Sequence, residues 1–122
     1  MFFTGRFEVT VNDKGEFFIP EYYAEEMEVG TKYDVFCGLT GYEKDMLFFV
    51  FSQPEKYYDC GKKLCSGRVT EDKKLQVPEE FLEKMKGEAH LIGNFCALEL
   101  TKVPIELLVD EDDIKGLKIN IE

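Results

Sequence analysis

A chain of 122 residues with a formal net charge of −10 fits one compact domain, or two very small domains that share a core. It contains no run of about 18 apolar residues, so no membrane-spanning helix and no membrane partner are expected. The negative charge argues against a general polyanion-binding coat, because nucleic-acid-binding proteins usually present a basic face. The N-terminus lacks the apolar stretch of a secretion signal, so we expect a cytoplasmic protein.

The charge is spread unevenly along the chain. Five Lys/Arg against eleven Asp/Glu give residues 1–57 a charge of −6. Residues 58–103 hold eight of each and are neutral, and residues 104–122 carry −4. These blocks coincide with the predicted organisation, which is a first repeat, a linker with a second repeat, and an acidic C-terminal extension. A surface that binds a polyanion would have to lie in the middle block.

The first predicted elements are two strands joined by a tight turn. Residues 6–11 alternate apolar and polar side chains, which is typical of a half-buried strand. Residues 12–15, Asn-Asp-Lys-Gly, have the chemistry of a turn, and residues 16–19 predict a strand that returns antiparallel to the first. Phe18 should point outward because both of its neighbours point inward. An outward aromatic side chain at that place suggests an interface, and irregular local packing within the barrel is the plain alternative.

A short helix is expected over residues 21–27. Pro20 suits its first turn, because an N–H at that place would have no acceptor within the helix. Residues 32–39 predict a third strand. Residues 46–51 are apolar on both faces, which predicts a strand buried on both sides or placed at a subunit interface. Residues 52–66 are expected to form the linker.

The same order of elements is predicted a second time. Two strands around a turn, a helix and two closing strands are predicted at residues 68–70, 74–77, 79–86, 89–95 and 97–100.

The two halves are also similar in sequence. Aligning Pro20 with Pro78 gives a shift of 58 positions, at which Phe17 matches Leu75. A unit of that size is too small to be comfortably stable alone, so the two copies should share one core.

The C-terminal extension carries one more predicted strand. Leu117, Ile119 and Ile121 alternate with polar residues, as in a half-buried strand. Residues 110–113 are all acidic but lack the spacing of a calcium-binding EF-hand loop, so a solvated turn is expected there.

Two copies of strand–turn–strand–helix–strand–strand, each with a proline at the strand-to-helix joint, resemble the MraZ family. That family belongs to the AbrB-like (SpoVT/AbrB) swapped-hairpin superfamily. Residues 91–100, Leu-Ile-Gly-Asn-Phe-Cys-Ala-Leu-Glu-Leu, are similar to an L-x-G-x-F-x-x-x-E-hydrophobic run of the family. The resemblance implies a mainly β fold with short capping helices, an AbrB/MraZ-like double-split β-barrel built from two tandem pseudo-repeats. It also implies a transcriptional regulator that binds repeated DNA boxes as a ring-like homo-oligomer.

The chain departs from the family at the turn between the first two strands of each copy, where the family carries a D-x-x-x-R signature. The first copy has Asn12 and Glu16 at the Asp and Arg positions, and the Glu16 carboxylate would repel phosphate. The second copy has Thr70 and Lys74, and a lysine keeps the positive charge without the bidentate fork of arginine. We therefore expect a divergent member with weakened DNA binding.

Basic residues of the second copy are the candidate DNA contacts: Lys73, Lys74, Arg68, Lys62 and Lys63. The two turn lysines are expected to be exposed, so that replacing them leaves the fold intact. A solvated surface on a negatively charged protein is the plain alternative. Two hypotheses follow: a DNA-binding regulator that uses the second turn, and a non-DNA-binding oligomeric interaction or scaffold protein that kept the fold.

No catalytic, metal or cofactor role is predicted. The cysteines Cys37, Cys60, Cys65 and Cys96 are expected to be free thiols. The five-position spacing of Cys60 and Cys65 is looser than that of the usual zinc knuckle. His90 is the only histidine. A Cys–His nucleophile through Cys37 or Cys96 is the enzymatic alternative, but the sequence shows no base and orienting group for it.

Overall fold

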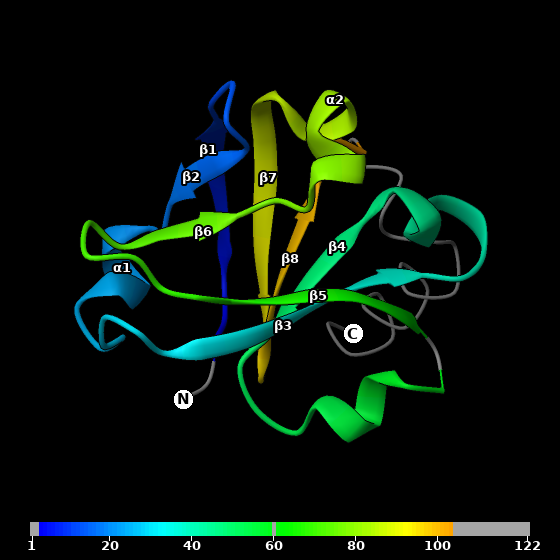
Figure 1. Cartoon of the computed structure of the whole chain (residues 1–122), viewed down its shortest axis with the longest axis horizontal. Helices are drawn as coiled ribbons and strands as arrows, with labels where there is room; N and C mark the ends of the chain where they lie inside the picture. The colour runs from blue at the N-terminus through cyan, green and yellow to red at the C-terminus, as the bar shows by residue number, and fades with distance from the viewer. Residues whose placement is uncertain (1–2, 60, 104–122) are drawn as a thin grey trace, which may run out of the picture.

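The computed structural model describes residues 3–59 and 61–103, and this part of the chain is mainly β (Figure 1). The strands are β1 (Arg6–Val11), β2 (Glu16–Phe18), β3 (Lys32–Gly38), β4 (Leu47–Val50), β5 (Gly61–Arg68), β6 (Lys74–Gln76), β7 (Gly87–Asn94) and β8 (Ala97–Thr101). The α-helical turns are α1 (Glu21–Ala24) and α2 (Leu82–Met85), and the 3-10 turns are η1 (Gly41–Asp45), η2 (Pro54–Tyr57) and η3 (Glu79–Phe81).

The two halves of the chain interlock. β1 of the first half pairs with β7 of the second, β5 of the second pairs with β3 of the first, and β4 meets β8. The resulting six-stranded antiparallel sheet has the order β1-β7-β8-β4-β3-β5. Exchanging β1–β4 with β5–β8 gives the same order read from the other edge of the sheet. Both halves therefore have the predicted succession of strands and helix. Closure into a barrel and an origin by duplication stay predictions.

The small sheet of β2 and β6 lies where the halves cross. Phe17 is directly opposite Leu75, and these are the residues that the alignment of the halves matches. Two equivalent backbone hydrogen bonds flank the pair, from Ile19 N–H to Lys73 O (2.9 Å) and from Val77 N–H to Gly15 O (2.8 Å). A pairing between equivalent residues places Phe17 and Leu75 on the approximate two-fold axis that relates the halves.

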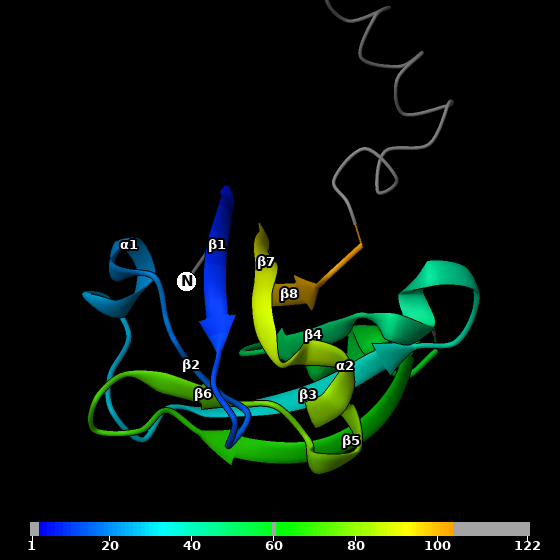
Figure 2. The ribbon, with the colours of Figure 1, turned by 90° about the horizontal axis from the view of Figure 1, so that it is seen from above.

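The hydrophobic core lies inside the curl of the six-stranded sheet. Figure 2 shows β1 and β7 running steeply across the direction of β3 and β5, with β2 and β6 beside the lower end of β1. Phe17 and Phe49 are fully buried there, and their rings meet edge to face with centroids 5.5 Å apart. Leu75 and Leu98 belong to the same cluster. The core therefore contains side chains from both halves, as the sharing of one core requires.

The predicted strand at residues 46–51 is confirmed as β4, and its two faces are covered within the chain. Phe49 faces the main core. Val50 belongs to a second small cluster with Phe36, against which the half-buried Phe48 and Tyr57 pack. Because η2 supplies Tyr57 as a cover, the apolar outer face of β4 does not by itself require a subunit interface.

Two predictions about local structure are wrong. β5 begins at Gly61, inside the predicted linker, because its residues complete the ladder with β3 from Gly38 to Lys32. The helix predicted over residues 21–27 is confined to the single turn of α1, and the chain then turns at Gly30 with a φ of 86°.

The helix predicted over residues 79–86 begins as the 3-10 turn η3 and becomes α-helical only in α2. The predicted strand at residues 117–121 and the acidic residues 110–113 lie outside the described residues. Within residues 3–59 and 61–103, the helices are too short and too polar to cross a membrane.

Phe17→Ala should lower the free energy of unfolding by about 3–5 kcal/mol, because it leaves a cavity between the two halves. Phe18→Ala is the matched control one residue along, since its ring is 62% exposed. It should cost no more than about 1 kcal/mol, mainly the contact of its ring with a lysine. Urea unfolding followed by circular dichroism measures both, and equal losses would contradict the axial position of Phe17.

Candidate functional site

The two turns that hold the family signature positions share one internal geometry. Asn12 Oδ1 accepts the backbone N–H of Glu16 over 2.9 Å. Thr70 Oγ1 accepts the backbone N–H of Lys74 over 2.9 Å. A short polar side chain that bonds the backbone in this way holds a turn closed. Asn12 and Thr70 therefore have a structural role in these turns, whatever the protein binds.

Glu16 and Lys74, the two residues at the family's arginine position, form an ion pair with each other. Lys74 Nζ lies 3.9 Å from Glu16 Oε1 and 3.2 Å from Asp72 Oδ2. The Lys74 side chain is only 19% exposed, and Nζ lies 4.7 Å from the centroid of the Phe18 ring. The Thr70 hydroxyl and the Lys74 ammonium hold the pKa of Asp72 below its ordinary value. The lysine is thus neutralised by two carboxylates.

Sequence reasoning considered Glu16 and Lys74 separately and missed the pair. The sequence contains a feature that predicts this pair, because Glu16 and Lys74 occupy the same position of the aligned halves and carry opposite charges. Once β2 pairs with β6 about a two-fold axis, such positions come close together.

Lys73 points into the first half of the molecule. Its backbone is left-handed, with a φ of 61°. Its ammonium donates hydrogen bonds to the carbonyl oxygens of Ala24, over 3.1 Å, and of Met27. Ala24 is the last residue of α1, and its carbonyl also accepts the Met27 N–H over 3.3 Å. The Lys73 ammonium therefore adds a charged donor at the C-terminal end of this turn, where a lysine is favoured. The expectation that the two turn lysines are exposed is therefore wrong for both, since Lys73 is half-buried and the Lys74 side chain is held beside two carboxylates.

The other three candidate DNA contacts lie on the edge strand β5. Arg68 Nη1 donates to the Gly30 carbonyl over 3.0 Å. Lys63 Nζ lies 3.5 Å from Asp34 Oδ1. Lys62 is exposed and has neither an ion pair nor a hydrogen bond with the described part of the chain. Lys62 and Arg68 are six positions apart in a strand, which separates them by about 20 Å. The five candidates thus do not gather into one compact cluster.

The cysteines and the histidine do not come together as a reactive group. Free thiols in the described residues are Cys37, Cys65 and Cys96, whereas Cys60 lies outside them. Burial raises the pKa of the Cys65 thiol, which disfavours its reactive thiolate form. His90 lies in β7 between Glu8 of β1 and Thr101 of β8. No cluster of three or more His, Cys, Asp or Glu in the described residues has a metal-binding arrangement.

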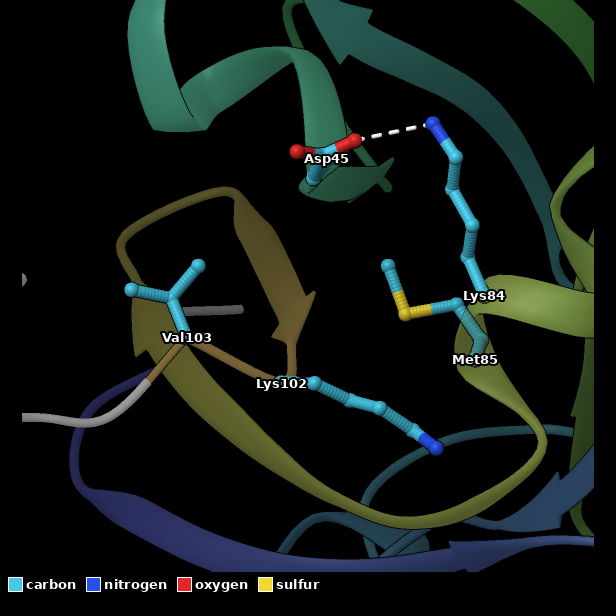
Figure 3. A pocket seen from close by; sticks show the side chains of 5 residues that line it. All are labelled: Asp45, Lys84, Met85, Lys102 and Val103. Carbon is cyan, nitrogen blue, oxygen red and sulfur yellow. Dashed lines mark hydrogen bonds and ion pairs between the residues drawn. The ribbon is translucent and has the colours of Figure 1, made fainter.

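A pocket of about 420 Å³ lies between η1, α2 and the end of β8 (Figure 3). Its lining residues are Asp45, Lys84, Met85, Lys102 and Val103. Lys84 Nζ is 2.8 Å from Asp45 Oδ1, and the Lys102 ammonium donates to the carbonyl of Lys86. Since both ammonium groups already have partners, the pocket offers a ligand no uncommitted charge from these lining residues.

Glu99 is a carboxylate held in the middle of the six-stranded sheet. It lies in β8 between Phe48 of β4 and Ile92 of β7. Asn94 Nδ2 donates to its Oε2 over 2.6 Å. Burial raises the pKa of Glu99, and the nearby charge of Glu43 raises it further, against the opposing effect of the Asn94 hydrogen bond.

Comparisons with known proteins give no further assignment: no family model matches the chain, and a search of curated proteins finds no match. Membership of the MraZ family therefore stays a prediction from the residues quoted above.

Lys73→Met should lower the free energy of unfolding by about 1–3 kcal/mol, because it leaves two carbonyls near α1 without their charged donor. Lys62→Met is the matched control, since it makes the same change at an exposed side chain and should cost no more than about 0.5 kcal/mol. Urea unfolding measures both. Equal effects would show that the Lys73 bonds contribute nothing to the fold.

Glu99→Gln should make the protein more stable than the wild type at neutral pH. With a raised pKa, folded Glu99 holds its proton more tightly than the unfolded chain does. The contribution of the Glu99 carboxyl to stability is therefore fully present below its ordinary pKa of 4.5, and it is lost as the pH rises through the raised pKa of the folded state.

Thermal unfolding of wild type and Glu99→Gln across a pH series tests this. The advantage of the variant should disappear in acid, below the ordinary pKa of the carboxyl. Glu55→Gln, at an exposed glutamate of η2, is the control and should show no such trend. A constant difference at every pH would contradict the raised pKa.

Proposed function

We propose that this protein is a non-DNA-binding, oligomeric interaction protein that keeps the swapped-hairpin arrangement of the family it resembles. The ion pair between Glu16 and Lys74 is the observation that carries the proposal. In the family the corresponding position supplies an arginine to DNA. Here one half of the chain neutralises the other at that position, and Asp72 adds a second carboxylate 3.2 Å from the ammonium.

The remaining basic residues support the same reading. The electrostatic part of DNA affinity comes from Lys and Arg side chains that neutralise phosphates and so release the counterions condensed on the DNA. Of the five candidate residues, only Lys62 has no partner within residues 3–59 and 61–103. With a net charge of −10, the chain would also repel a polyanion at long range.

Exposed apolar side chains support a role in protein interaction. Six large hydrophobic residues of the described part are about half exposed or more: Phe18, Tyr22, Val29, Leu39, Tyr58 and Phe95. Phe18 is the last residue of β2, and Tyr22 lies in α1. Their side chains are 62% and 63% exposed, so they offer aromatic surface that a partner would bury. Tyrosine and phenylalanine are enriched in interface cores for that reason.

A DNA-binding regulator is the second candidate, favoured by the basic residues of the edge strand β5 and by the family resemblance. It would require Lys74 to leave Glu16 and Asp72 when DNA approaches. Because both carboxylates remain beside the site, the net charge that a phosphate meets there would still be unfavourable.

Gel-shift and sedimentation measurements on the same preparation test the proposal. Wild type should give no shift with a pool of random duplexes at low salt, and it should self-associate at micromolar concentration. Glu16→Arg should gain binding that weakens steeply with salt, because it removes one of the two carboxylates beside Lys74 and adds a guanidinium. Glu55→Arg is the control, with the same charge change away from β2 and β6.

Two results would overturn the proposal. A wild-type shift that Lys74→Glu abolishes would favour the regulator. A wild type that stays monomeric at high concentration would exclude an oligomeric interaction protein.

A further inference from the structure

β1 is an edge strand with an unpaired side. Among the described residues it pairs with β7 alone. In the same register Phe3 and Phe95 exchange both backbone hydrogen bonds, at 2.7 and 3.0 Å, so the odd-numbered residues of β1 bond to β7. Glu8 and Thr10 therefore direct their N–H and C=O groups away from β7. Such an edge can accept a further strand.

A groove lies against this unpaired side. Asn12 N–H donates to Glu16 O over 2.9 Å at the turn, but β2 then leaves β1 and pairs with β6. The groove that opens between β1 and the joint of β2 with α1 has a volume of about 370 Å³. Phe7, Val9 and Ile19 supply apolar lining.

The charge of this groove is negative. Glu8 of β1 and Glu21 of α1 are the charged side chains among its described lining residues. Phe18 stands at the rim, 62% exposed. The site thus combines free backbone groups, an apolar floor and two carboxylates.

The equivalent groove of the second half has a similar volume, about 320 Å³, but a different chemistry. Gln76 takes the place of Phe18, and its Nε2 already donates to the Lys14 carbonyl over 2.7 Å. Glu80 takes the place of Tyr22. Both grooves have apolar lining beside an edge strand, and of these two described grooves only that of the first half adds an exposed aromatic ring, Phe18.

An extended segment with alternating apolar and basic or polar side chains would fit such a groove. The chain has one beyond the described residues. Leu117, Ile119 and Ile121 share one face of the strand that the sequence predicts there, and Lys118 lies on the other face. Lys115 precedes it, so residues 115–121 bring two lysines and no carboxylate to a negative groove, although the whole extension of residues 104–122 carries −4.

We propose that residues 117–121 of one copy add as a strand to β1 of a second copy. This inference rests on the proposed function, because it names the interface that forms the oligomer. Residues 104–116 separate the segment from Val103, and thirteen extended residues span about 45 Å, enough to reach a neighbour. In Figure 2 the end of β8 lies on the side of the molecule away from α1 and β2.

Two complementary variants of the full chain test the exchange by sedimentation velocity. Ile119→Asp spoils the segment, because its carboxylate would be buried without a partner, and Phe18→Glu spoils the groove. Each should weaken self-association at least about tenfold. An equimolar mixture should recover a complex, because the Phe18→Glu chain still donates an intact segment to the intact groove of Ile119→Asp.

A second groove variant and two controls accompany them. Thr10→Pro removes an N–H that faces the groove and costs no bond to β7, so it should also prevent association. Asn120→Asp places the same carboxylate on the opposite face of the segment and should still assemble. Leu39→Glu changes another exposed hydrophobic residue, beyond the end of β3, and should also assemble.

The outcomes separate this interface from the proposed function. An Ile119→Asp protein that assembles like wild type would overturn the interface and leave the interaction protein standing. A mixture of the two variants that stays monomeric would overturn the exchange between copies. A monomeric wild type would overturn both proposals.

Discussion

The pairing of β2 with β6 is the constraint on which the rest of the structure depends. Phe17 and Leu75 face each other there and are each only 1% exposed. Neither half can make this sheet alone, so the halves have to fold together. Once β2 is committed to β6, β1 must leave it after the turn and pairs with β7, and β5 pairs with β3 for the same reason. The order of the large sheet follows from the small one.

The same pairing decides what the signature turns can do. As single residues, Glu16 and Lys74 are two departures from an arginine. As neighbours across β2 and β6 they are one ion pair, 3.9 Å long, next to the second carboxylate of Asp72. A partly exposed pair of this kind contributes little to stability, but it cancels the charge that a phosphate would meet. Its main effect is therefore on function, and it favours a protein partner over DNA.

Local signals predicted the parts of the fold that local physics determines. Alternation in β1 and the prolines before α1 and η3 mark a strand face and a helix start within a few residues. Non-local contacts were not accessible in that way. Lys73 reaches a carbonyl 49 positions away, and β5 gains its length from β3 although Gly61 and its neighbours show no strand alternation. The free edge of β1 likewise became visible only with the complete strand order.

The two halves agree where they build the fold and differ where they face solvent. A proline precedes each helical turn, and Phe17 and Leu75 fill the axis in both. At the exposed positions Phe18 corresponds to Gln76, which uses its amide to close the neighbouring turn. Because the two halves are related by an approximate two-fold axis, each surface of one half has an equivalent on the other half. The side chains on the two equivalent surfaces can differ. The groove beside β1 carries the exposed ring of Phe18, while its counterpart beside β5 carries the Gln76 amide at the equivalent position, so the two grooves offer a partner strand different contacts. Function in this fold is therefore best inferred from the differences between the halves, since the similarities already serve stability.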